Sequence, residues 1–349
     1  MKKLLNTLYV TTPNAYIYKD GQNIVVSVEN EEVFRIPAIN IQAINTFGYQ
    51  GASPGVMKLC SDNGISLSFH TPQGRFIARL QGPSQGNILL RSRQFDFVKD
   101  KNLSLNLATL FIYGKLYNSR AILRRFLRDY PAHNNKEDIL AVSEKLKRLA
   151  VKSLQIDNHD NLRGLEGEGA SGYFSIFDDL ILNQKQNFKF NNRNRRPPTD
   201  YVNAMLSMGY SMLANDCAAA LEGVGLDPAA GFMHALRPGR NSLALDLMEE
   251  MRGYIVDRFV LSMINTRQIS PTDFKTHTET TSSLKPSVTF TDNGLKKYLG
   301  AWQARKKTEF IHPYLNERIS IGLLPHVQAL LLARYLRGDI DNYPVFLIK

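Results

Sequence analysis

Cysteine is nearly absent from the sequence, which has two among its 349 residues. Cys60 and Cys217 lie far apart, and neither belongs to a Cys-x-x-Cys pair. This pattern excludes both a disulfide framework and a zinc finger, and it predicts two buried thiols. The sequence also lacks a Gly-x-x-x-x-Gly-Lys-[Ser/Thr] loop, so nothing in it indicates ATP-driven chemistry.

Long apolar runs are missing as well, and with them any candidate for a membrane-spanning helix. The sequence has a single tryptophan, and no Trp-rich basic amphipathic helix of the kind that lies on a membrane surface is found. The apolar start resembles a signal peptide only until Asn6 and Thr7 interrupt it. We therefore expect a cytoplasmic protein that does not act at a membrane.

Positive charge, in contrast, is abundant. Lys and Arg number 43 against 32 Asp and Glu, which gives a net charge of +11 and a sequence pI near 9.5. Clustered Lys and Arg gain affinity for polyanions by releasing counterions from phosphates. Nucleic acid is therefore the leading candidate partner, and an anionic membrane surface is the alternative.

The hydrophobic pattern changes its period along the chain and predicts an α+β fold. Up to about Gly82, short runs rich in Val, Ile, Phe and Tyr alternate with turn signals, as in β hairpins. From about Leu89, apolar residues recur three and four apart, as one buried helix face requires. We predict an N-terminal antiparallel β domain over residues 1–84, followed by a larger, mainly α-helical domain over residues 85–349. The Gly- and Pro-containing stretch 81–87 is the predicted linker.

Two familiar patterns occur without the context that their chemistry needs. GASPG, residues 51–55, matches the Gly-x-Ser-x-Gly pattern of a serine hydrolase, but Pro54 offers no N–H for an oxyanion, so Ser53 is predicted to lie in a plain turn. GEGASG, residues 167–172, matches a dinucleotide-binding pattern, but the residues before it are polar and do not form a buried strand. Neither a hydrolase nor a nucleotide site is indicated.

The segment FMHALRPGRNSLALDLMEEMR, residues 232–252, combines one histidine with a carboxylate-rich helical run. Asn241 or Ser242 is a good helix cap, and apolar residues four apart then define one buried face. The acidic residues fall on another side of this helix: Asp246, Glu249, Glu250 and Asp257. From the helix alone, this acidic stripe is either an ordinary solvated face or part of a metal site.

His234 stands just before a Pro238-Gly239 turn, which would fold its imidazole back toward this helix. A lone histidine before a turn is more often structural than a ligand, although histidine is the commonest metal ligand. Arg237 and Arg240 flank the turn, and beside a metal they would clamp phosphate oxygens. The segment alone leaves both interpretations open.

Glu166 is the third candidate ligand. Gly169, Ala170 and Tyr173 follow it at helical spacing, and such small residues let a second helix approach closely and bury the glutamate. A buried carboxylate needs a partner, which would be a divalent cation or an arginine such as Arg163. One His with two or three carboxylates suits Mg²⁺ or Mn²⁺, and zinc fits less well because there is no His-Glu-x-x-His spacing. Such a site suits phosphoryl transfer on a phosphodiester.

Together, these segments resemble a known family. The sequence is similar to the CRISPR-associated integrase and endonuclease of spacer acquisition, the Cas-one family, and most like its subtype I-C members. The resemblance covers nearly the whole chain. It rests on MKKLLNTLYVTTPNAY, EGEGASGYF, RRPPTDYVNAMLSMGYSML, GFMHALRPGRNSLALDLMEEMR and LLPHVQALLLARYLRGD.

The resemblance implies a β domain that dimerises and a helical catalytic domain that carries Mg²⁺ or Mn²⁺. The family's ligands fall on Glu166, His234 and Glu249, with Asp246 one helical turn earlier as a second acidic catalytic position. Glu168 and Glu250 have no assigned role and are expected to be solvated. The implied reaction is transesterification, in which the 3′-hydroxyl of a prespacer attacks a phosphodiester of the repeat array.

The resemblance also implies partners: prespacer and repeat duplex DNA, a second copy of the chain, and a dimer of a small companion Cas protein. Basic residues would line the DNA surface, although each could equally be a solvated charge. The candidates are Arg193, Arg195, Arg196, Arg237, Arg240, Arg305, Lys306 and Lys307. Two other functions stay open: a general metal-dependent nuclease on branched or damaged DNA, and a non-catalytic basic DNA-binding scaffold.

Overall fold

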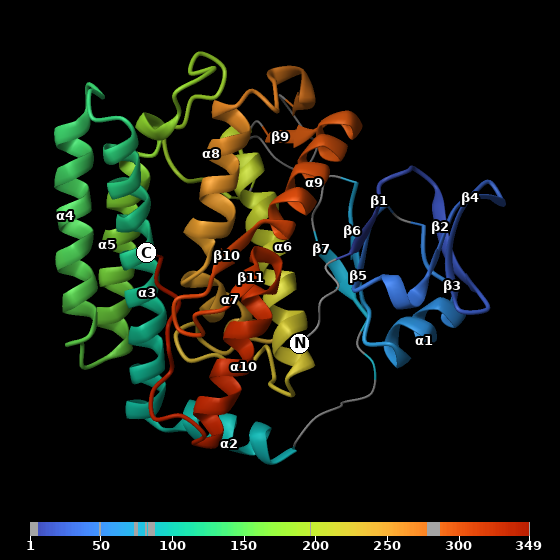
Figure 1. Cartoon of the computed structure of the whole chain (residues 1–349), viewed down its shortest axis with the longest axis horizontal. Helices are drawn as coiled ribbons and strands as arrows, with labels where there is room; N and C mark the ends of the chain where they lie inside the picture. The colour runs from blue at the N-terminus through green and yellow to red at the C-terminus, as the bar shows by residue number, and fades with distance from the viewer. Residues whose placement is uncertain are drawn as a thin grey trace.

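The computed structural model describes residues 6–48, 50–72, 76–80, 82, 88–195, 197–277 and 287–348. The fold is α+β, as predicted. In Figure 1 the N-terminal strands, in blue, gather at one end of the molecule, and the helices fill the rest. In the part of the chain given above, no helix is long and apolar enough to cross a membrane.

The N-terminal region contains two sheets. One is an antiparallel meander of β2 (Ala15–Asp20), β3 (Asn23–Val28) and β4 (Glu31–Pro37). The other has the strand order β1 (Thr7–Val10), β5 (Ala43–Phe47), β6 (Ser66–His70) and β7 (Phe76–Arg79). Inward side chains from both sheets form one hydrophobic cluster, which includes Ile17, Ile24, Ile44 and Leu67.

The strand pairing corrects the prediction of an antiparallel domain in one respect. β5 pairs in parallel with both β1 and β6. Parallel neighbours need a crossover connection, and helix α1 (Pro54–Asp62) provides it between β5 and β6. The predicted plain turn at GASPG is thus the start of a helix. Pro54 occupies its first turn, where no N–H is needed, and Ser53 Oγ accepts the N–H of Val56 at 3.2 Å.

The remainder is mainly helical, with two short hairpins. Its helices are α2 (Ile88–Lys99), α3 (Lys101–Asp129), α4 (Lys136–Ser153), α5 (His159–Ser175), α6 (Tyr201–Gly223), α7 (Ser242–Glu249), the π-helix η3 (Gly253–Asp257), α8 (Arg258–Asn265), α9 (Asp292–Lys307) and α10 (Leu324–Arg337). The hairpins pair β8 (Phe274–His277) with β9 (Ser287–Phe290) and β10 (Glu309–Ile311) with β11 (Arg318–Ser320).

Helix α3 is the central element of the helical region. It packs against α4 and α5, beside which it lies in Figure 1, and it also contacts α7 and η3. Its buried apolar residues, among them Phe111, Leu116 and Leu123, join the larger hydrophobic cluster. Each such side chain stabilises the fold by about 1.5–3 kcal/mol through burial. The long helix thereby becomes a rigid support for the polar residues that it carries.

The two regions touch through a few specific contacts. Phe47 belongs to the larger cluster, and Arg79 forms an ion pair with Glu222. His70 lies 3.2 Å from the amide nitrogen of Asn215, and burial lowers the pKa of this histidine to about 4, so it is neutral. The predicted boundary between residues 84 and 85 falls outside the described residues and stays a prediction.

Candidate active site

The loop before α7 is folded around the carboxylate of Asp246, which is fully buried. Asp246 accepts the backbone N–H groups of Phe232 at 2.6 Å, Met233 at 2.9 Å and His234 at 2.9 Å. Gly231 makes this approach possible, because a Cβ there would lie 2.7 Å from the backbone of Ser242. Both oxygens of Asp246 therefore accept hydrogen bonds from the loop and fix its conformation.

His234 is oriented by the same carboxylate. Its Nδ1 lies 2.6 Å from Asp246 Oδ1 and must donate, because an ionised carboxylate only accepts. This bond fixes the tautomer and leaves Nε2 as the nitrogen with a free lone pair. The predicted turn folds the histidine back toward α7, as expected from Pro238-Gly239.

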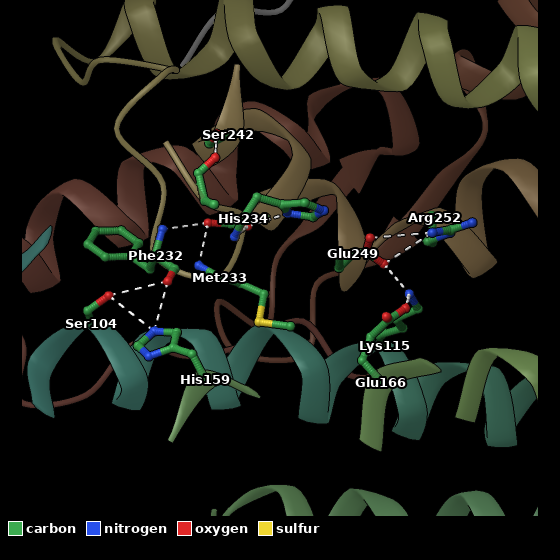
Figure 2. Close-up of polar contacts among 12 residues, drawn as sticks. Ser104, Lys115, His159, Glu166, Phe232, Met233, His234, Ser242, Glu249 and Arg252 are labelled. Carbon is green, nitrogen blue, oxygen red and sulfur yellow. Dashed lines mark hydrogen bonds and ion pairs between the residues drawn. The ribbon is translucent and has the colours of Figure 1, made fainter. Parts of the chain in front are cut away.

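The loop is also fastened to the helices below it. The carbonyl of Phe232 lies 3.0 Å from His159 Nε2 and 3.3 Å from Ser104 Oγ, which come from α5 and α3 (Figure 2). His234 is thus held between α7 on one side and α3 and α5 on the other. The loop that carries it is therefore attached to three helices.

Glu249 ends α7 and is buried among positive charges. Lys115 Nζ lies 2.8 Å from Oε2, and Arg252 Nη1 lies 3.2 Å from the same oxygen (Figure 2). Burial by itself would raise the pKa of Glu249, but Lys115 and Arg252 hold it well below its usual range. The carboxylate is therefore ionised throughout the neutral range.

Lys115 on α3 also forms an ion pair with Glu166 on α5, so one ammonium joins two glutamates from different helices. Figure 2 shows the three side chains meeting where α3, α5 and α7 come together. The sequence offered Arg163 as the alternative partner of Glu166, and the structure corrects this: Arg163 pairs with Asp160. The side chain of Glu166 retains 27% exposure, which leaves it open to a ligand.

The small residues after Glu166 work as predicted. A Cβ at Gly169 would come within 2.2 Å of the Leu116 side chain, which would have to move, so the glycine favours this close packing of α5 on α3. Glu166 sits one turn earlier on the same helix, and this close packing brings its carboxylate to Lys115. The helical spacing of the small residues therefore correctly predicts that Glu166 lies beside a closely packed second helix.

Lys115 itself was not found by sequence reasoning, although a signal for it exists. It is a single lysine within FIYGKLY, on a helix whose neighbouring residues are apolar and buried. A lysine in such a place is costly to bury unless carboxylates surround it. An isolated lysine on a buried helix face therefore indicates nearby carboxylates, which here are those of Glu166 and Glu249.

Of the two interpretations of the acidic stripe, the structure excludes the solvated face. Asp246, Glu249, Glu250 and Asp257 are all buried, and each has its own partners. Asp257 is the last residue of η3 and accepts a hydrogen bond from Tyr210, and the guanidinium of Arg252 lies 4.1 Å from the centre of the Tyr210 ring. Burial raises the pKa of Asp257. The four acidic residues are therefore buried and hold neighbouring segments in place through hydrogen bonds and ion pairs.

Glu250 is the clearest departure from expectation, since a solvated side chain was predicted. It accepts hydrogen bonds from Tyr343 Oη, from Gln328 Nε2 at 3.0 Å and from the N–H of Phe346 at 2.6 Å. Burial raises its pKa to about 7. Glu168, by contrast, is exposed as predicted, with only a surface ion pair to Lys145 at 2.9 Å.

The predicted DNA-binding residues divide into two groups. Arg195, Arg237 and Lys307 are exposed, and Arg240 is half-buried near His234 in the chain. Arg196 lies outside the described residues.

The other three are engaged inside the protein. Arg193 binds Asn203 and Ser207, and burial lowers its pKa to about 10. Lys306 is buried against Asp216 at 3.0 Å, and Arg305 donates to the carbonyl of Tyr254 at 2.9 Å. The charges of Arg193 and Lys306 therefore support the fold directly.

The carboxylates of Glu166 and Glu249 and the imidazole of His234 are ligand types that suit a divalent cation such as Mg²⁺ or Mn²⁺. Among the described residues, no three His, Cys, Asp or Glu side chains stand as a ready-made ligand group. Glu166 and Glu249 nevertheless converge on one positive charge, the ammonium of Lys115, and Figure 2 shows the imidazole of His234 next to Glu249. An ion held by these residues would replace an interaction that Lys115 now makes. Their assignment as ligands stays a prediction.

Comparison with known proteins places the fold and the site in context. A family model described as CRISPR associated protein Cas1 matches residues 8–304. A CRISPR-associated endonuclease Cas1 from Chlorobaculum tepidum is 44% identical over 346 residues, covering 99% of both chains. Another, from Rhodospirillum rubrum, is 44% identical over 353 residues, covering 100% of both.

A solved structure shares the architecture as well. A casposase bound to integration product is similar with a TM-score of 0.81 and 25% sequence identity, covering 98% of this chain and 94% of that chain. Fold, sequence and family match agree along nearly the whole length. The chain belongs to the Cas1 family of CRISPR-associated endonucleases.

Proposed function

We propose that this Cas1 protein is a metal-dependent DNA integrase and endonuclease of CRISPR adaptation, most like those of subtype I-C. It joins the 3′ ends of prespacer DNA into the repeat array. The observation that carries the proposal is the meeting of Glu166 and Glu249 on one positive charge beside an oriented His234. The similarity to a casposase bound to integration product supports joining as the chemistry.

The proposed ligands of Mg²⁺ or Mn²⁺ are Glu166, Glu249 and Nε2 of His234. A bound divalent cation stabilises the charge that develops on a phosphate and lowers the pKa of an attacking hydroxyl. The protein prepares the ligand atoms for the cation. Lys115 and Arg252 keep Glu249 ionised. The hydrogen bond from His234 Nδ1 to Asp246 leaves Nε2 of His234 facing away from Asp246. Asp246 is therefore a positioning residue.

The reaction is a direct exchange of phosphodiester bonds. The 3′-oxygen of the prespacer bonds to phosphorus in the repeat strand, the existing P–O bond breaks, and the departing oxygen leaves as a 3′-hydroxyl. No covalent bond to the enzyme forms. The proposed role of Arg237 and Arg240, which belong to the loop that carries His234, is to hold the non-bridging oxygens of this phosphate.

The proposed assembly is a homodimer formed through the β domain, bound to duplex DNA and to a dimer of a small companion Cas protein. Exposed apolar side chains on β4 and just after it support a second copy at this surface: Val33 is 55% exposed, Phe34 42% and Ile39 77%. Such residues are costly to leave in water as a group. Sedimentation at about micromolar concentration should give a dimer mass, and a monomer would contradict this part of the proposal.

The proposal is tested by incubating the protein and its companion with prespacer DNA and a repeat-containing duplex. With Mg²⁺ or Mn²⁺, we expect a branched product in which a prespacer 3′ end is joined to the repeat, and with EDTA we expect none. Cleavage without joining would instead indicate a general nuclease for branched or damaged DNA. DNA binding with neither activity would indicate a non-catalytic scaffold.

A further inference from the structure

A second basic site lies further along α3, on a different side of the helix from Lys115 and the two glutamates. It is a cavity of about 440 Å³. Five arginines line it, together with Tyr117: Arg120, Arg124, Arg125, Arg128 and Arg258. Four of the arginines come from α3, where Arg120, Arg124 and Arg128 follow one another at intervals of four residues and Arg125 lies at the edge of the same cavity. The fifth reaches in from α8.

Few carboxylates balance these charges. Among the described residues, Asp129 lies 3.4 Å from Arg125 and 3.3 Å from Arg128, and Glu144 lies 3.6 Å from Arg120. Arg124 has no carboxylate partner in the same part of the chain. Three positive charges therefore remain without compensation around one cavity.

The inner wall of the cavity is arranged in advance. The guanidinium groups of Arg258 and Arg305 lie 5.0 Å and 5.3 Å from the ring centre of Tyr254, which holds two like charges near each other through cation–π contact. Burial, and then repulsion from Arg305 and Arg125, lowers the pKa of Arg258 to about 10. The Nε atoms of Arg120 and Arg305 are buried without a hydrogen-bond partner. An anion in the cavity would relieve this crowding.

The shape and composition of the cavity select among anions. Its volume lies in the range of about 300–1,000 Å³ that is usual for small-ligand sites, so it admits a nucleotide-sized group and is too small to enclose a duplex. Guanidinium forks match the paired oxygens of a phosphate. Tyr117 adds an aromatic face of the kind on which unpaired bases stack.

We propose that this arginine cavity binds backbone phosphates of a single DNA strand, as a contact separate from the catalytic glutamates. The inference rests on the proposed function, because DNA is taken as the ligand. It adds to that function a place where an unpaired strand is held on the outer face of α3. Neither the charge pattern of the sequence nor the family match assigns this place, since the four α3 arginines were not among the candidates.

The test is the salt dependence of binding to a short, fluorescein-labelled single-stranded oligonucleotide, followed by fluorescence anisotropy in EDTA. The double variant Arg124→Gln/Arg128→Gln should bind about tenfold more weakly. The slope of log K against log salt should shrink by about 1.4, since each single-strand phosphate contact contributes about 0.7. Both side chains are exposed, so the fold should not change.

The matched control is Arg334→Gln/Arg337→Gln on α10, which removes the same charge from another exposed surface. Equal slopes and affinities for the two double variants would overturn the proposal. So would competition by inorganic phosphate or polyglutamate as effective as that of unlabelled DNA, because the site would then be a general anion site. The binding assay needs no metal and no joining, so a failure of the proposed reaction appears only in the joining assay.

Discussion

Replacing Glu166 with glutamine is expected to lower the rate of metal-dependent joining by at least about a hundredfold, because the variant loses a charged donor to the cation. The amide has the same shape as the carboxylate, and Lys115 keeps Glu249 as its partner. Stability should therefore change by less than about 1 kcal/mol, as for a partly exposed ion pair. Joining and cleavage are measured with the companion protein present, and DNA affinity and melting temperature are measured in parallel.

Two further variants make this result specific. Glu168→Gln lies two residues along the same helix, exposed and paired only with Lys145, and should behave as wild type. Asp246→Asn places an amide against three backbone N–H groups and the imidazole of His234, and we expect a loss of about 10- to 100-fold, typical of groups that orient a metal ligand. If Glu166→Gln joins DNA as wild type does, the metal site is wrongly assigned.

Replacing Glu250 with alanine is expected to lower the free energy of unfolding by about 3–5 kcal/mol. The change leaves the hydroxyl of Tyr343 and the N–H of Phe346 buried without their acceptor, and it removes one of the acceptors of the Gln328 amide. It also leaves a cavity beside Gly114 on α3, where Glu250 packs. Urea unfolding measures the loss.

The surface glutamate again provides the control, since Glu168→Ala removes only an exposed ion pair and should cost less than about 1 kcal/mol. Limited proteolysis should in addition cut the Glu250→Ala variant earlier than wild type near residues 343–348, because these residues lose their attachment. An unfolding midpoint equal to that of wild type would show that Glu250 does not fasten this segment.

The sequence predicted the parts of the site that depend on local spacing. Glu166 is followed by small residues at helical intervals, and His234 precedes a turn, so each position could be derived from its neighbours. The order of β and helical regions follows from the change of hydrophobic period in the same way. Helix α1 was missed because GASPG was interpreted as a plain turn, although a proline without an N–H also suits the first turn of a helix.

What the sequence could not predict are partners distant along the chain. Lys115 meets Glu166 51 residues later, and Glu250 meets Tyr343 93 residues later. No local pattern links such pairs, because tertiary packing alone brings them together. The π-turn η3 adds to the difficulty, since it shifts Asp257 away from the face that a regular α-helix would give it.

The hydrogen bonds of Glu250 to Tyr343 and Phe346 also determine when this part of the fold can be completed during synthesis. Tyr343 and Phe346 leave the ribosome 93 and 96 residues after Glu250, which amounts to roughly 5–20 s of synthesis. Until then, Glu250 lacks two of the groups that donate hydrogen bonds to its carboxylate. A nascent chain therefore contains Glu166, His234, Asp246 and Glu249 before Glu250, the residue next to Glu249, has its hydrogen bonds to Tyr343 and Phe346. We therefore expect the end of α7 to reach its final packing only after Phe346 has been synthesised.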